Sequence, residues 1–359
     1  MLVRVYPRLA FSGAKHVSRV LAVLLALVSS TAVAGYVPRA EVEAAARAAA
    51  VEAKAYADRS ALVAGLLQAQ TRSVVEPLIN EARMVALLAR LREAPAPSPQ
   101  ARTAVEALRD YAVQTYTDPV DPEQRRLQVP AFAVAGAARA ALHRWDSAAA
   151  KAAYADALAR ADLAALHAAT DAAALEAVVR EASDAQLQLL RAADLRPPRA
   201  RRALFERLRE PQLALALLRT PATPEGLQLI AGIDTVLDGP AAFAVLSDAA
   251  LDDAYVSAAR LAIGRLVPEH PASRAHLLAT LGDGEGASSA AALSHRMDAQ
   301  TLAALDEIVA GSGDGSRLRH ALLALRLSGD AEARSVLARF AADETRPAAL
   351  RDEVAAWLR

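Results

Sequence analysis

The chain contains no cysteine among its 359 residues. This absence excludes disulfides, thiolate nucleophiles, cysteine-based zinc sites and iron–sulfur clusters. Aromatic residues make up only 4% of the sequence, and there are three lysines against 38 arginines. So few aromatic residues argue against a β-sandwich or barrel, whose strands are enriched in β-branched and aromatic side chains. Because basic and acidic side chains balance at 41 each, the composition gives no indication of nucleic-acid binding.

Alanine and leucine are abundant, with 93 and 51 copies respectively. Both residues are strong helix formers. Hydrophobic residues make up 54% of a chain with no net charge, which argues against global disorder. The composition therefore predicts an all-α fold.

The first 34 residues have the plan of a secretory signal peptide. Basic residues come first, an apolar run covers 20–28, and small residues lead to Ala34, all before the first acidic residue, Glu41. Cleavage between Ala34 and Gly35 leaves 37 basic and 41 acidic side chains. The apolar run is shorter than the roughly 20 residues of a comfortable membrane span. We therefore expect a periplasmic or secreted protein, with inner-membrane anchoring by an uncleaved signal as the alternative.

Alanine-rich helices are expected over 35–93. Apolar and small residues within 40–75 recur in a heptad-like stripe, which indicates either a long helix packed on the rest of the chain or a coiled coil for self-association. A proline-rich linker at 94–100 ends this region. A helical region over 101–196 follows, and the three prolines of its polar loop, 117–130, forbid continuous helix there. That loop is either a functional loop or a plain connection.

The C-terminal part contains an internal repeat. Its units begin at regular intervals of 30–31 residues, at Pro224, Ala254, Glu285, Ser316 and Pro347. Each full unit reads as two helices separated by a short turn, and apolar residues mark one face of each helix, as at Leu318, Ala321, Leu322 and Leu325. A two-helix unit cannot bury such faces alone, whereas stacked copies can. The pattern over 197–359 therefore predicts an α-solenoid of helical hairpins with a period of about 31.

These units resemble the HEAT repeat, in the short bacterial form first noticed in phycobilisome lyases. The resemblance rests on a Leu-Arg pair, spaced alanines and a Gly-Asp turn, found at Leu318, Arg319, Ala321, Ala324, Leu325, Gly329 and Asp330. Leu350 and Arg351 with Ala355 and Leu358 form a second match; a third begins at Val256, where Ser257 replaces the family's arginine. The resemblance covers only 197–359. It implies a protein-binding scaffold and transfers no catalytic residue.

The sequence contains none of the familiar catalytic, metal-binding or phosphate-binding motifs. The seven histidines include no H-E-x-x-H pair, and there is no G-x-S-x-G nucleophile motif. The Gly-Asp-Gly turns lack the lysine and the preceding strand of a phosphate loop. We therefore expect no catalytic residue, no cofactor and no metal site. An enzyme with an unrecognised site, using the 117–130 loop, remains the alternative.

One cluster of arginines is a candidate binding site for an anion or a partner. Its members are Arg196, Arg199, Arg201 and Arg202. Guanidinium forks suit phosphate or carboxylate groups, which favours a binding role. Glu206 and Glu210 are interleaved with further arginines, which favours instead a solvated face with i, i+4 ion pairs. Both interpretations are open at this stage.

The sequence as a whole predicts an exported, non-catalytic scaffold or adaptor. We expect it to bind another protein in the periplasm or cell envelope of a bacterium through a HEAT-like solenoid surface. A ligand-binding module built on the 196–209 arginines is the further alternative.

Overall fold

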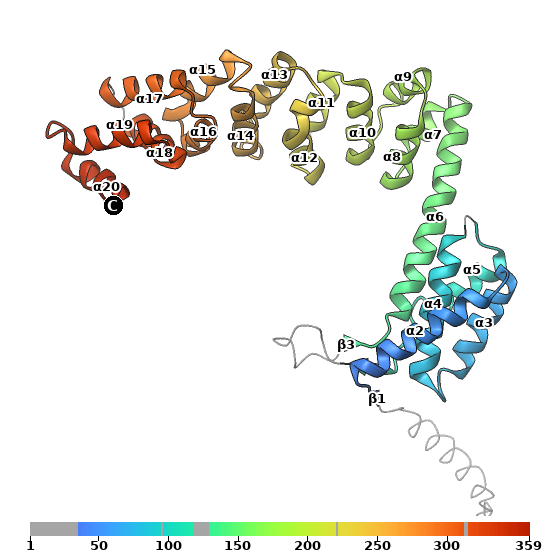
Figure 1. The fold of residues 1–359 in the computed structure, drawn as a ribbon. Coiled ribbons are helices and arrows are strands. Elements are labelled where there is room, and N and C mark those ends of the chain that lie inside the picture. The colour runs from blue at the N-terminus through green and yellow to red at the C-terminus, as the bar shows by residue number, and fades with distance from the viewer. Residues whose placement is uncertain (1–34, 95, 118–128, 220–221, 312–314) are drawn as a thin grey trace, which may run out of the picture. The chain divides into compact units, whose positions relative to one another are not determined.

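The computed structural model describes residues 35–94, 96–117, 129–219, 222–311 and 315–359. The predicted signal peptide, including Ala34, and most of the 117–130 loop lie outside the described residues. The described chain is helical apart from turns, connections and one small sheet, so the all-α prediction is confirmed (Figure 1). It divides into two compact units, Met1–Ala149 and Ala150–Arg359.

The first unit is a helical cluster. Its helices are α2 (Arg39–Ala55), α3 (Arg59–Arg72), α4 (Pro77–Glu93), α5 (Pro99–Glu106) and the first part of α6 (Val134–Ala159). Helices α2 and α3 both pack against α4, and α3 also contacts α5. The core between them contains fully or almost fully buried large side chains, including Leu66, Met84, Leu88, Leu91 and Trp145.

The alanine-rich segment 40–75 is two helices, so the expectation of one long helix was wrong. Helix α2 ends before Tyr56, whose backbone is extended. Asp58 then begins α3, because its side chain accepts a hydrogen bond from the Ala61 amide at 2.8 Å. Part of the apolar stripe is buried inside the unit, at Ala49 and Ala53. Self-association through this region stays a prediction.

A small sheet includes two strands in segments where the sequence predicted helix and a third at the end of the predicted 117–130 loop. Strand β2 (Thr115–Thr117) pairs in parallel with β1 (Gly35–Tyr36) and antiparallel with β3 (Val129–Pro130). Glu81 of α4 is completely buried and accepts a hydrogen bond from the Gln114 amide at 2.7 Å and one from the Thr115 hydroxyl. This carboxylate fixes the start of β2 against the helical core.

The second unit continues with short helices joined by tight turns. They are α7 (Leu163–His167), α8 (Ala172–Glu181), α9 (Asp184–Ala192), α10 (Pro198–Leu208), α11 (Pro211–Leu218), α12 (Pro224–Gly232), η2 (Ile233–Thr235), α13 (Gly239–Ala249), α14 (Val256–Leu266), α15 (Pro271–Ala279), η3 (Thr280–Gly282), α16 (Gly286–Ser294), α17 (Ala299–Gly311), α18 (Gly315–Ser328), α19 (Ala331–Ala342) and α20 (Ala348–Leu358). Prolines open many of these helices, where a missing amide costs nothing.

Successive helices alternate between two layers (Figure 1). In one layer, here called the first layer, α8, α10, α12, α14, α16 and α18 contact one another in that order. In the other, α7 contacts α9, α11 contacts α13, and α15, α17 and α19 follow one another. The two-layer arrangement therefore begins at α7, whereas the sequence predicted that the helical repeats start at residue 197. Assignment of these pairs to the HEAT class stays a prediction.

Two hydrophobic cores run through the second unit and meet at α10. One contains side chains from Ala157 to Leu204, and the other contains side chains from Phe205 to Val354. Helix α10 contributes Ala200, Ala203 and Leu204 to the first core and Phe205 to the second. No described helix is long and apolar enough to cross a membrane.

Candidate functional site

The arginine cluster predicted from the sequence lies at the start of α10. Arg196 precedes the helix, and Arg199, Arg201 and Arg202 belong to its first turns. Pro198 occupies the first helical position, where its fixed backbone angle suits a helix start. Helix α10 lies between α8 and α12 in the first layer, so its side chains reach both neighbours.

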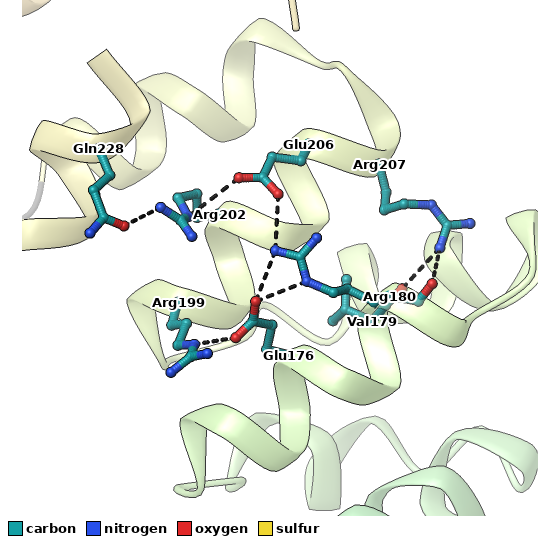
Figure 2. Close-up of polar contacts among 8 residues, drawn as sticks. All are labelled: Glu176, Val179, Arg180, Arg199, Arg202, Glu206, Arg207 and Gln228. Carbon is teal, nitrogen blue, oxygen red and sulfur yellow. Dashed lines mark hydrogen bonds and ion pairs between the residues drawn. The ribbon is translucent and has the colours of Figure 1, made fainter. Parts of the chain in front are cut away.

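Glu176 of α8 is the centre of the contacts in Figure 2 and is only 7% exposed. One carboxylate oxygen lies 2.8 Å from a guanidinium nitrogen of Arg180, and the other accepts a hydrogen bond from Nε of Arg199. Burial acts to raise the pKa of Glu176, but the hydrogen bonds from Arg180 and Arg199 outweigh it and leave the pKa below its ordinary value. The Glu176 carboxylate is therefore charged and held by two cations at neutral pH.

The contacts extend from this carboxylate to α12. Arg180 also donates to Glu206 of α10 at 3.2 Å, and its bond with Glu176 raises its own pKa. Nε of Arg202 lies 3.4 Å from Glu206, and its Nη1 donates to the side-chain oxygen of Gln228 on α12. Figure 2 shows these groups facing one another across the three helices. The cluster thus joins α8, α10 and α12.

A further arginine of α10 binds the end of the preceding first-layer helix. Arg207 donates to the carbonyl oxygen of Arg180 at 2.5 Å, with a longer bond to Val179 (Figure 2). It also donates to the carbonyl oxygen of Ala182 at 2.9 Å. The Val179 and Arg180 carbonyls belong to the last turn of α8, at the negative end of its dipole, and Val179 also accepts a hydrogen bond from the Ala182 amide at 3.4 Å. Arg265 binds the Ala231 carbonyl at the end of α12 in the same manner, at 2.9 Å.

Arg196 and Arg201, the other two residues of the cluster, have different surroundings from each other. Nε of Arg196 donates to Nε2 of His167 at 3.0 Å, while Nδ1 of His167 lies 2.8 Å from the Asp194 carbonyl oxygen. In this arrangement Nε2 of His167 accepts a hydrogen bond, while Nδ1 lies against a backbone carbonyl oxygen. The side chain of Arg201 has no hydrogen-bond or ion-pair partner in the part of the chain that the structure describes. Three of the four predicted residues therefore bind groups of the chain itself.

Sequence reasoning identified the arginines of this site but missed their partners. The interleaved Glu206 does lie beside Arg202, as the i, i+4 spacing indicated, whereas Glu210 pairs with Arg191 at 3.1 Å. Glu176 and Gln228 lie on neighbouring hairpins, 23 and 26 residues from their arginines. From the sequence, only a regular number of residues between neighbouring hairpins could have indicated these two partners. Anion binding by the cluster stays a prediction.

Comparison of the chain with protein-family models, curated proteins and solved structures finds no match. The site must therefore be interpreted from its own geometry. Within the described ranges, no group of three or more histidine, aspartate or glutamate side chains is placed to hold a metal ion.

The lowered pKa of Glu176 predicts acid-sensitive stability. A carboxyl group whose pKa is lower in the folded state stabilises the fold above its unfolded pKa, near 4.5, and this contribution is lost as the pH falls through the folded value. Glu176→Gln is expected to lower the free energy of unfolding by about 1 kcal/mol at pH 7 and by much less at pH 3. Urea denaturation at both pH values measures this difference.

Glu181→Gln is the matched control on the same helix. Glu181 pairs with Lys151 at 2.7 Å but is 66% exposed, so its loss should change stability by less than about 0.5 kcal/mol. A Glu176→Gln deficit of equal size at pH 3 and pH 7 would contradict the ion-pair interpretation.

Proposed function

We propose that the protein is an exported, non-catalytic scaffold that binds another protein through the outward face of the first layer. The observation that supports this most directly is a row of exposed leucines on that layer. Leu227 of α12, Leu261 of α14 and Leu327 of α18 are 46%, 40% and 52% exposed. Soluble proteins bury most leucine side chains, and an apolar patch on a regular helical surface is typical of a protein-binding site.

Each first-layer helix has one exposed stripe, and the leucines belong to these stripes. On α14, the exposed positions are Ser257, Leu261 and Arg265, four residues apart, while the residues between them are mostly buried. Because α12, α14, α16 and α18 pack side by side, their outward stripes form one continuous surface. Helix α16 contributes the small exposed residue Ala287 to it.

Exposed arginines border this surface. Arg201 on α10 is partly exposed and Arg319 on α18 is exposed, and within the described chain neither side chain has a hydrogen-bond or ion-pair partner. Arginine is enriched in protein interfaces because its planar fork binds carboxylates and its stem packs on apolar groups. A partner with apolar anchors and flanking acidic side chains fits this pattern. Export is supported by the plan of residues 1–34.

Introducing charge at the exposed leucines of the first layer tests the proposal. The full-length protein, tagged at its C-terminus, is crosslinked in its native host, and captured proteins are quantified by mass spectrometry. The double variant Leu227→Asp, Leu261→Asp is expected to lose its dominant envelope partner by roughly tenfold or more, because buried interface leucines become charged. The same sample gives the mature N-terminus, expected at Gly35.

Leu251→Asp is the matched control. Leu251 is 82% exposed but lies in the turn before α14, outside the first-layer stripes. The Leu251→Asp substitution should leave the amount of captured partner unchanged. All variants should keep the helical circular-dichroism spectrum of the parent protein. Equal capture by the double variant and the parent protein would reject this face as the binding surface.

A further inference from the structure

A cleft of about 470 Å³ lies between α5 and α6 in the first unit. Its lining residues are mostly charged: Arg102, Glu106, Arg109, Arg139, Leu142, His143 and Asp146. Arg102 and Glu106 come from α5, Arg109 follows that helix, and the others belong to α6. Clefts of this size are typical of small-molecule sites.

Both acidic side chains of the cleft are bound by one arginine. Nε of Arg102 donates to Glu106 at 2.9 Å, and its Nη1 donates to Asp146 at 2.8 Å. The hydrogen bonds to Asp146 and Glu106 raise the pKa of Arg102. These three groups thus neutralise one another in part and connect α5 to α6.

Among the described residues, the other two arginines of the cleft have no acidic partner. Within the described residues, no carboxylate lies within 4.0 Å of the Arg109 or Arg139 guanidinium. Nη1 of Arg139 donates at 3.4 Å to the carbonyl oxygen of Arg109, which places the two residues side by side. His143 follows Arg139 by one helical turn and therefore lies on the same face of α6. With three arginines against two carboxylates, the lining is positively charged even when His143 is neutral.

We propose that this cleft binds a phosphate group, either free or on a small organic molecule. Two guanidinium groups present paired N–H donors that match phosphate oxygens, and arginine is the residue best suited to such bidentate binding. His143 supplies a further donor from the same wall. The volume exceeds that of a phosphate ion, and the nearly buried Leu142, 9% exposed, provides an apolar contact for an organic group.

Isothermal titration calorimetry on the full chain tests the proposal with two probes, inorganic phosphate and phenyl phosphate. Arg109→Gln and Arg139→Gln are each expected to weaken binding about tenfold, which corresponds to the loss of one charge-assisted hydrogen-bonding group. Tighter binding of phenyl phosphate than of phosphate identifies an organic phosphate as the preferred ligand. Equal binding identifies the free anion.

Arg144→Gln is the matched control, because Arg144 is an exposed arginine next to His143 that does not line the cleft. Its Kd should stay within about twofold of that of the parent protein. Failure of both probes to bind would overturn the proposal. It would also be overturned if Arg144→Gln weakened binding as much as Arg109→Gln, because the effect would then be one of net charge alone.

Discussion

Replacing Gly264 by alanine is expected to lower the free energy of unfolding by about 2 kcal/mol. Gly264 lies in α14 where that helix packs against α16. A Cβ atom at this position would lie 2.8 Å from the carbonyl oxygen of Ala292 and 2.9 Å from its Cβ. The obstructing atoms belong to a helix backbone and a methyl group, so no flexible side chain can move aside. The two helices must separate, and their shared core loses contacts.

Gly311→Ala gives the same chemical change without the obstruction. Gly311 ends α17, and a Cβ atom added there would meet no described atom within 4 Å. Because alanine favours helix over glycine, this variant should be neutral or more stable by up to about 1 kcal/mol. Urea denaturation of both variants measures the contrast. A similar effect in both would show that α14 and α16 are not in close contact at Gly264.

Glu81→Ala is expected to lower the free energy of unfolding by about 3 kcal/mol. Glu81 is completely buried and binds the Gln114 amide at 2.7 Å and the Thr115 hydroxyl. Truncation leaves the amide and the hydroxyl without an acceptor and opens a cavity beneath β2. Such an unsatisfied buried group costs more than the hydrogen bond itself contributes.

Two variants on the same helix test this expectation by urea denaturation. Glu81→Gln keeps one acceptor oxygen in place, so it should lose only about half as much stability as Glu81→Ala. Glu93→Ala removes an exposed carboxylate at the end of α4 and should change stability by less than about 0.5 kcal/mol. Equal effects of Glu81→Ala and Glu93→Ala would show that the buried carboxylate does not hold the strand.

The sequence predicted the helical hairpins well where glycine and proline mark their ends. The units expected from Pro224, Glu285 and Pro347 match helices that begin at Pro224, Gly286 and Ala348. The predicted apolar face of α18 is also confirmed, since Leu318, Ala321, Leu322 and Leu325 are all buried. These features are local, so a single sequence contains the information that decides them.

Other features depend on contacts that a single sequence does not encode locally. The break before α3 has neither glycine nor proline, and only the capping side chain of Asp58 marks it. The Glu176–Arg199 and Arg109–Arg139 pairs join residues 23 and 30 positions apart. Spacing of charges along one helix indicated i, i+4 pairs, but it does not show which hairpins lie beside each other or by what offset. The cleft between α5 and α6 was therefore not predictable from the sequence.

Helix α10 has a consequence for how the second unit folds and opens. Its Ala200 and Leu204 complete one core and its Phe205 completes the next, so the two cores have one wall in common. When the helices before α10 separate, Ala200 and Leu204 lose their packing partners. Helix α10 is then held less firmly, which also weakens the packing of Phe205 in the second core. Opening therefore propagates from one packed helix to the next. The second unit should consequently melt as one cooperative unit at α10 rather than divide there into two independently folding halves.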